Sequence, residues 1–272
     1  MQYFEVSGGV PLKGSIEPQG AKNEALQIIS AVLLTPEPVE VSNIPDILDV
    51  NLLIGLLAEM NVSVEKKGPG TVVFRANDVN VDYLHSEDFR KKSGRLRGSV
   101  MLAGPMLARF RKAFIPKPGG DKIGRRRLDT LITGFEQLGA AFSYHPEDGF
   151  FHLEAPNLSG TRLLLEEPSV TGTANIIMAA VMAKGTTTLY NAACEPYIQQ
   201  LCRMLIRMGA KINGIGSNLL TIEGVTYLGG TTHRMLPDMI EIGSFIGMAA
   251  MTKGAVTIKN AAVEQLGICL LY

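Results

Sequence analysis

Two stretches of the chain repeat one pattern, and that pattern decides the fold. The first is GAKNEALQIISAVLLTPEPVEVSNIPDILDVNLLIGLLAEM, residues 20–60, and the second is GTANIIMAAVMAKGTTTLYNAACEPYIQQLCRMLIRM, residues 172–208. Each predicts a helix of small and apolar residues, a turn, a short strand, and a second helix with apolar residues at i, i+3 and i+4. Each strand ends in Asn, at Asn43 and Asn191, and a Met follows seventeen residues later. The matching registers indicate an internal repeat.

Outward from these stretches the repeat extends over most of the chain. After the second helix, each copy has an alternating strand, a turn that contains Gly and another strand, which predicts a β-hairpin. The unit is therefore helix, strand, helix, strand, strand. A third copy occupies residues 95–155, with the longest loop of the set inserted after its first strand. A fourth begins at Gly243 and stops at Tyr272, before any hairpin, so we expect it to be incomplete.

The composition is that of an ordinary globular protein. Of 272 residues, 46% are apolar and 19% charged, which suffices for one large or two medium domains. Lys plus Arg equals Asp plus Glu at 26 each, so no overall field attracts nucleic acid or anionic lipid. The three cysteines lack C-x-x-C spacing and favour neither a disulfide framework nor a zinc site. Without a leader peptide or a long apolar window, we expect a soluble cytoplasmic protein with no membrane partner.

The loop KPGGDKIGRRRLDT, residues 117–130, is the clearest candidate for chemistry. Its glycines and arginines suit a cradle for a phosphate or carboxylate group. A carboxylic acid among such ligands, here Asp121, could act as a general acid. Arginines lower the pKa of such a group whereas burial and a bound phosphate raise it, so its protonation state stays open. The alternative is a solvated basic loop in which Asp121 is a turn residue.

Two cations stand where helices are predicted to begin, at Lys22 and Arg97. Positive charge there opposes the helix dipole unless an anion joins it, so both positions favour an anion site. The alternative is two exposed first turns in which solvent screens the charge. A third corresponding turn, residues 168–175 at the start of the stretch 172–208, carries hydroxyls, which suit a sugar or phosphate but also serve as plain helix caps.

Other catalytic patterns are missing from the sequence. The four histidines have no metal-ligand spacing and are interpreted as surface or packing residues. No P-loop, zinc-protease or nucleophile-elbow motif is present, so we expect neither a metal nor a cofactor.

With GAKN at residues 20–23, PGGDKIGRRRLD at 118–129 and SVTGTAN at 169–175, the chain resembles the UDP-N-acetylglucosamine 1-carboxyvinyltransferases, or enolpyruvyl transferases. The resemblance covers essentially the whole chain. It implies an inside-out α/β barrel of βαβαββ-type repeats, with one complete domain plus part of a second. The complete domain would span residues 22–236, while residues 1–21 would supply strands to the second domain and residues 237–272 would begin it.

The resemblance also implies a reaction. These enzymes transfer the enolpyruvyl group of phosphoenolpyruvate to the 3'-hydroxyl of UDP-N-acetylglucosamine and release phosphate, in the first committed step of peptidoglycan synthesis. Asp121 would be the proton donor, and Lys22 a catalytic residue that binds substrate. The remaining substrate-binding positions would be Asn23, Arg97, Arg126, Arg127, Leu128, Asp129, Thr130, Glu167, Pro168, Ser169 and Val170.

The chain departs from the family pattern at several points. Glu167 replaces the common Lys, Leu131 the common His, and Met239 the common Arg. The family's aspartate that deprotonates the hydroxyl, and a late arginine, would lie beyond Tyr272. We therefore expect the chain alone to turn over slowly or not at all.

Three alternatives stay open. The shikimate-pathway enolpyruvyl transferase shares the repeats, but its first motif has a Ser and an Arg that GAKNEAL lacks. An inactive binding fragment of the family is a second alternative. A nucleic-acid module is the most distant one, because few aromatic residues lie near the basic loop.

Overall fold

The computed structural model describes residues 3–116, 128–147 and 149–267, and it confirms the repeated unit. Each copy contributes a helix, a strand, a second helix and two further strands, in the predicted order. The first copy consists of α1 (Lys22–Ala31), β2 (Val39–Ser42), α2 (Leu48–Glu59), β3 (Ser63–Gly68) and β4 (Thr71–Arg75). In chain order, the second copy is the one at residues 95–155, and it consists of η3 (Arg97–Leu102) continued by α4 (Ala103–Phe110), then β5 (Lys112–Pro116), α5 (Asp129–Gln137), β6 (Ala141–His145) and β7 (Phe150–Glu154). The third consists of α6 (Val170–Ala180), β9 (Thr186–Tyr190), α7 (Pro196–Arg207), β10 (Lys211–Asn213) and β11 (Leu219–Glu223).

The strands of each copy form a sheet with one shared order. In every copy the last strand lies in the middle and pairs antiparallel with the other two, giving β2-β4-β3, β5-β7-β6 and β9-β11-β10. Two further strands join an edge in parallel: β8 (Arg162–Leu164) beside β9, and β12 (Thr231–Arg234) beside β2. Because β12 follows the third copy but joins the sheet of the first, it connects the end of the repeat to its beginning.

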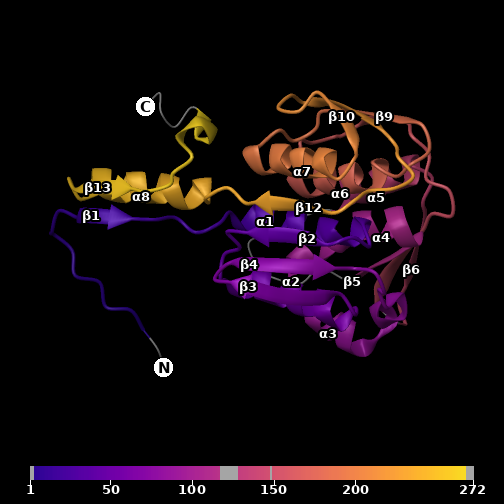
Figure 1. Ribbon diagram of the computed structural model, residues 1–272, viewed down its shortest axis with the longest axis horizontal. Helices are drawn as coiled ribbons and strands as arrows, with labels where there is room; N and C mark the ends of the chain where they lie inside the picture. The colour runs from indigo at the N-terminus through magenta and orange to yellow at the C-terminus, as the bar shows by residue number, and fades with distance from the viewer. Residues whose placement is uncertain (1–2, 117–127, 148, 268–272) are drawn as a thin grey trace.

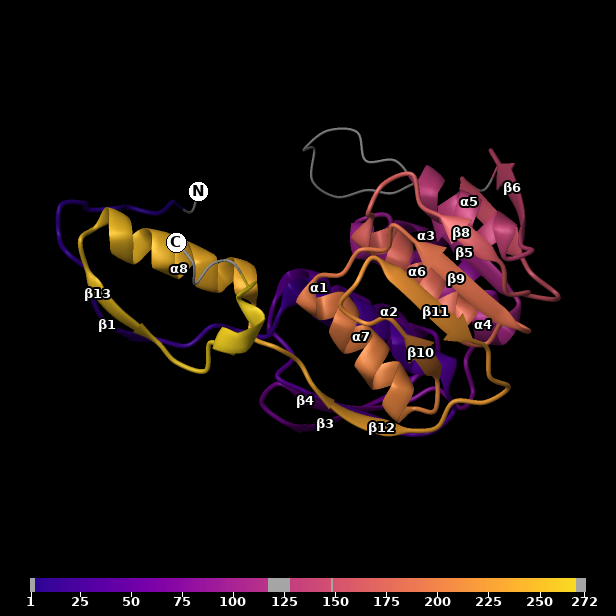
Figure 2. The same cartoon turned by 90° about the horizontal axis from the view of Figure 1, so that it is seen from above.

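The first helices of the three copies lie inside, and the sheets lie outside (Figure 2). Helix α6 is buried at every position from Gly172 to Ala180, and α4 from Ala103 to Ala108. Packing is close enough to require glycine, since a Cβ on Gly104 would lie 2.5 Å from the carbonyl oxygen of Asn175. The inside-out arrangement expected from the sequence is therefore confirmed. Small residues in these helices allow the backbones to approach, because a larger side chain would separate them.

The repeated asparagines have a structural role that explains their spacing. Asn43 and Asn191 have positive φ angles of 61° and 58°, a conformation that Asn tolerates better than most residues. Asn260, in the partial fourth copy, has φ 53°. The side-chain amide of each donates a hydrogen bond to a residue that directly follows a parallel neighbouring strand. The acceptors are Met235 O at 3.0 Å, Leu165 O at 2.9 Å and Glu17 Oε1 at 2.7 Å, respectively. Each Asn thus fastens the end of its strand to the adjacent one.

A smaller region lies to one side of the three copies (Figure 1). It contains β1 (Lys13–Ile16), α8 (Met239–Met251), β13 (Ala255–Ile258) and η4 (Val263–Gln265), with β1 and β13 paired in parallel. Pairing of a strand near residue 14 with one near residue 256 agrees with the predicted division at residues 1–21, 22–236 and 237–272, although those boundaries stay a prediction. Residues 4–9, predicted as strand, form none. Phe4 is 99% exposed there, and no strand among the residues that the structure describes pairs with this segment.

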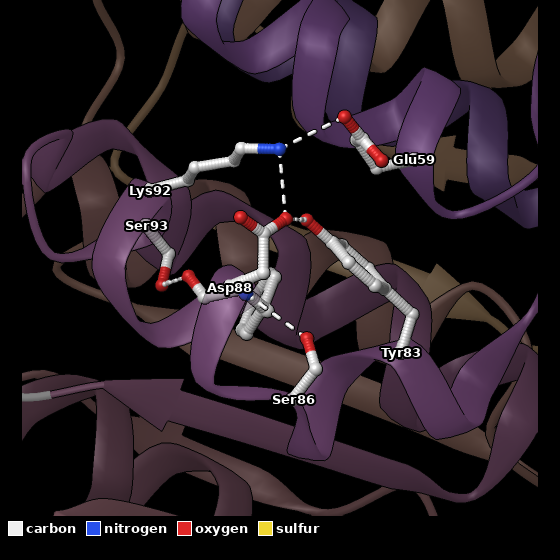
Figure 3. Close-up of polar contacts among 7 residues, drawn as sticks. Glu59, Tyr83, Ser86, Asp88, Lys92 and Ser93 are labelled. Carbon is white, nitrogen blue, oxygen red and sulfur yellow. Dashed lines mark hydrogen bonds and ion pairs between the residues drawn. The ribbon is translucent and has the colours of Figure 1, made fainter.

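One insertion between the first two copies was not predicted. It consists of η2 (Val81–His85) and α3 (Glu87–Ser93), and polar contacts fasten it to α2 (Figure 3). The amine of Lys92 lies 2.8 Å from Glu59 Oε1 and 2.7 Å from Asp88 Oδ2. The hydroxyl of Tyr83 donates to Asp88 at 2.7 Å. These side chains are well exposed or half-buried. We therefore interpret the cluster as a surface contact between α3 and α2, not as a binding or catalytic site.

The structure also bears on membrane association. Over the ranges described, every helix is too short or too polar to cross a bilayer.

Candidate functional site

A pocket of about 450 Å³ opens where three helical segments begin. Lys22 is the first residue of α1, Arg97 the first of η3 and Val170 the first of α6, and all three line it together with Asn23. The three repeats thus contribute equivalent positions to one cavity. Four of the residues predicted to bind substrate meet here, although they come from segments more than 70 residues apart in the chain.

The pocket has the electrostatics of an anion site. Helix N-termini carry partial positive charge and unsatisfied backbone N–H groups, and Lys22 and Arg97 add full charges. The ammonium of Lys22 lies 2.6 Å from Asp49 Oδ2, with 46% and 36% of the two side chains exposed. Because this pair is open to water, an arriving phosphate or carboxylate can compete with Asp49 for the amine. The alternative is that Lys22 lies on an isolated exposed turn. Its place in a pocket shared by three helix starts favours the anion site instead.

Helix α1 begins without a capping side chain of its own. Its N-cap residue is Ala21, and the backbone N–H of Lys22 donates instead to Asp238 Oδ2 at 3.0 Å. The other oxygen of Asp238 accepts from Ile240 N at 2.8 Å and Glu241 N at 3.2 Å, at the start of α8. One carboxylate therefore caps two helices, one in each region of the molecule. This bond fixes the backbone that carries Lys22.

The side chain of Asn23 has a partner in the third repeat. It lies close enough to the hydroxyl of Tyr197, in the first turn of α7, to affect the pKa of that phenol. Burial raises the pKa of Tyr197, the charge of Glu195 raises it further, and the interaction with Asn23 opposes both. Tyr197 is consequently a neutral phenol at physiological pH next to Asn23, which lines the pocket.

Two groups of predicted substrate-binding residues, 128–130 and 167–170, lie beside each other near the pocket. A Cβ placed on Gly172 would be 3.3 Å from both Ser169 and Thr130, so the start of α5 contacts the start of α6. Leu128 and Asp129 precede Thr130 at that end of α5. Glu167 and Pro168 are exposed in the loop before α6 and do not line the cavity. The hydroxyl of Ser169 accepts from Gly172 N at 3.2 Å, which is the plain helix cap allowed by the sequence.

The remaining predicted residues divide into two groups. Asp121, Arg126 and Arg127 lie outside the described residues, so their roles stay predictions. Of the departures from the family pattern, Leu131 is 2% exposed and belongs to the core. Met239 lines a small apolar pocket between the two regions instead of the basic cavity.

Sequence reasoning missed several residues that the fold brings to the site. Gln27, Asp49 and Arg95 line the basic pocket. The spacing of Lys22, Asn23 and Gln27 along α1 could have revealed Gln27, because i and i+4 share a helix face. Asp49 gave no signal, since it belongs to another helix.

The histidines are less scattered than their spacing suggested. The rings of His145 and His152 stack with centroids 4.0 Å apart, and His85 lies 5.9 Å from His152. His233 is buried at 4% exposure. Within the described ranges, no group of three or more His, Cys, Asp or Glu residues has a geometry that could hold a metal ion.

Three repeats whose central helices begin around one basic pocket define the enolpyruvyl transferase fold, and solved structures share it. The enolpyruvyl transferase NikO from Streptomyces tendae matches with a TM-score of 0.75 and 20% identity, over 88% of this chain and 55% of that one. EPSP synthase from Acinetobacter baumannii matches with a TM-score of 0.69 and 19% identity, over 93% and 57%. The family model of EPSP synthase (3-phosphoshikimate 1-carboxyvinyltransferase) matches residues 6–271, and the chain belongs to that family.

Curated relatives are much closer in sequence. A UDP-N-acetylglucosamine 1-carboxyvinyltransferase of Bacteroides thetaiotaomicron is 65% identical over 98% of this chain. One of Porphyromonas gingivalis is 62% identical over the same share. The chain spans 62% of the length of both relatives.

Proposed function

We propose that this protein serves the transfer of the enolpyruvyl group from phosphoenolpyruvate to the 3'-hydroxyl of UDP-N-acetylglucosamine, with release of phosphate. The supporting observation is the pocket in which Lys22 and Asn23, Arg97, and Val170 meet at three helix starts. The names of the relatives at 62–65% identity favour this acceptor over the shikimate-pathway one. The solved structures support the fold alone, because their identity is low.

The described residues of the pocket suit phosphoenolpyruvate. Lys22 and Arg97 would bind its phosphate and carboxylate, with Lys22 leaving Asp49 when the anion arrives. Cations held in place around the substrate stabilise the charge that grows on the phosphate as it leaves. Asn23, which lines the same pocket, would donate a further hydrogen bond to the substrate.

Asp121 would be the general acid. Its proton would go to the methylene carbon of phosphoenolpyruvate, which makes C2 electrophilic for the sugar hydroxyl. After addition, the methyl group would return a proton to Asp121 and the C2–O bond to phosphate would break, restoring the double bond of the enolpyruvyl product. The proton of the sugar hydroxyl would end on the released phosphate. The loop that carries Asp121 joins β5 to α5, and α5 begins beside Ser169.

The nucleotide would bind along the two adjacent segments, residues 126–130 and 167–170. Thr130 and Ser169 contact the same point near Gly172, so one ligand can touch both. In this role the protein would act in peptidoglycan and cell wall biogenesis in the cytoplasm, and through it in cell shape, cell cycle and division. Its partners would be small molecules, without nucleic acid, membrane or cofactor.

Calorimetry with UDP-N-acetylglucosamine and phosphoenolpyruvate tests the proposal, together with a phosphate-release assay. Lys22→Met and Arg97→Met should each weaken binding about tenfold or more, since a hydrogen bond to a charged group is lost. Lys92→Met, a surface lysine of the insertion, is the matched control and should bind as the wild type does. Tighter binding of shikimate 3-phosphate than of the UDP-sugar, or unchanged binding by Lys22→Met, would contradict the proposal.

A further inference from the structure

A hydrogen-bonded series of three polar side chains, two of them buried, lies behind the first turn of α1. Glu24 and His233 have 0% and 1% of their side chains exposed, and Glu24 Oε1 lies 2.8 Å from His233 Nε2. The other ring nitrogen, Nδ1, lies 2.6 Å from Nη2 of Arg207, which stands at the exposed end of α7. These residues come from α1, β12 and α7, so the contacts join three elements.

The hydrogen bonds of this series have one consistent direction. A guanidinium has only donors, so Arg207 donates and His233 Nδ1 must accept. The ring proton is then on Nε2 and is donated to Glu24. Burial raises the pKa of Glu24, whereas His233 and the backbone N–H of Leu236 oppose that rise. A neutral imidazole therefore connects a guanidinium with a carboxylate.

The same carboxylate reaches the segment that leaves the third repeat. Glu24 Oε2 accepts from Leu236 N at 3.1 Å, and Leu236 O accepts from Ala21 N at 2.8 Å. Both bonds flank Lys22 and Asn23, one on each side along the chain. Hydrogen bonds therefore hold the first turn of α1 on both sides of Lys22 and Asn23.

Stability alone gives little reason for such a series. Buried charged groups lose solvation, and apolar side chains of similar volume often stabilise a protein equally well or better. The neighbouring positions Ala25 and Ile28 are apolar and fully buried, so an apolar residue fits this environment. What the polar series adds is directional bonding, which fixes one orientation of the helix start.

We propose that Glu24, His233 and Arg207 act as positioning residues that hold the first turn of α1 so that Lys22 and Asn23 face the pocket in a geometry suited to an anion. The inference rests on the proposed function for the identity of the ligand. The contacts themselves do not depend on it.

The decisive variant replaces the two buried members together, Glu24→Met with His233→Leu. Because the buried charge is removed along with its partner, the variant should unfold at a temperature no lower than the wild type. Affinity for phosphoenolpyruvate and UDP-N-acetylglucosamine should nevertheless fall about tenfold, as expected for the loss of oriented contacts to a charged ligand. Hydrogen exchange at the amides of residues 22–25 should accelerate about tenfold, because the first turn of α1 would open locally more often without these contacts.

A matched control separates positioning from stability. Leu153→Ala empties a fully buried site in β7, in a different sheet, so it should lower the unfolding temperature while affinity and exchange at residues 22–25 stay as in the wild type. Unchanged affinity and unchanged exchange in the double variant would overturn the proposal. So would an equal loss of affinity in Leu153→Ala, because stability would then explain the effect.

A second series covers the case in which the double variant does not fold. Arg207 is the exposed member of the three hydrogen-bonded side chains, so variants at this position should fold. Arg207→Lys keeps a donor for His233 Nδ1 and should retain most of the affinity, whereas Arg207→Met should lose about threefold or more. Equal affinities in the two variants would contradict the proposal. If the wild type binds neither substrate, the proposed function fails, while the exchange rates of residues 22–25 in Arg207→Met and Arg207→Lys still decide the positioning role.

Discussion

Helices α6 and α8 occupy the same place in their repeats, yet their surroundings are opposite. Both consist mostly of apolar and small residues, and α6 is buried at each position from Gly172 to Ala180. In α8 only Ile242 is buried, while Met251 is 88% exposed. Helix α6 packs among α4, α5 and α7, whereas α8 has β13 on one side within the described part of the chain. An apolar composition thus predicts that a helix is buried. Whether it is buried depends on the helices and strands that pack around it.

The largest expected difference between the two helices concerns apolar truncation. Ile177→Ala in α6 removes a side chain of 0% exposure and should lower the free energy of unfolding by about 3 kcal/mol. Ile246→Ala in α8, at 42% exposure, should cost less than about 1 kcal/mol. Urea denaturation of the two variants measures both values. Equal losses would mean that α8 is covered in solution.

Glycine substitution gives a second, smaller contrast. Gly104→Ala in α4 would place a methyl group 2.5 Å from the Asn175 carbonyl oxygen, so we expect a loss of about 2 kcal/mol from overpacking. A Cβ at Gly247 in α8 meets nothing within 4 Å, and Gly247→Ala should stabilise that helix by about 0.5 kcal/mol through helix propensity. Thermal unfolding followed by circular dichroism should show shifts of opposite sign. A destabilised Gly247→Ala would refute the open environment of α8.

The side-chain hydrogen bonds of Asn43 and Asn260 give a third contrast between the two regions. Asn43→Ala loses a half-buried hydrogen bond to Met235 O and places Ala at positive φ, for a combined cost of about 2 kcal/mol. Asn260→Ala loses only an exposed bond to Glu17 and should cost about 1 kcal/mol, nearly all of it from the backbone. Asn→Gly at each site isolates the hydrogen bond, because Gly adopts positive φ freely. Indistinguishable glycine variants would count against a structural role for the Asn43 bond.

The smallest effect concerns the surface insertion of the larger region. Burial, and then the hydrogen bond to Asp88, raises the pKa of Tyr83 to about 12. The folded state therefore keeps this proton longer than the unfolded state, whose tyrosines titrate near about 10. The stabilising contribution is complete below about pH 10 and is lost as the pH rises through about 12. Near-ultraviolet titration of the wild type and of Tyr83→Phe should differ by one late-titrating phenol, and an unchanged late phase in that variant would reject the assignment.

The sequence predicted the repeat because small-residue helices, strand-end asparagines and second helices recur in register. It also predicted that Lys22 and Arg97 begin helical segments, and equivalent positions of a symmetric fold must meet. It did not predict residues 81–93, which are short and have no counterpart in the other copies. Nor could it predict the contact of Glu24 with His233, since the pair is separated by 209 positions and depends on where β12 docks. Long-range polar contacts leave no local pattern.

Where the chain passes between its two regions, Gly20 bridges Pro237, and Asp238 N donates to Gln19 O at 2.8 Å. Gly20 is required there because a Cβ would lie 1.8 Å from Asn43 O. A polypeptide cut to residues 19–238 would consequently begin and finish at adjacent points. A linker of a few residues could join them, and new termini could be opened at the exposed turn of residues 214–217, giving a circular permutant of the three-repeat body.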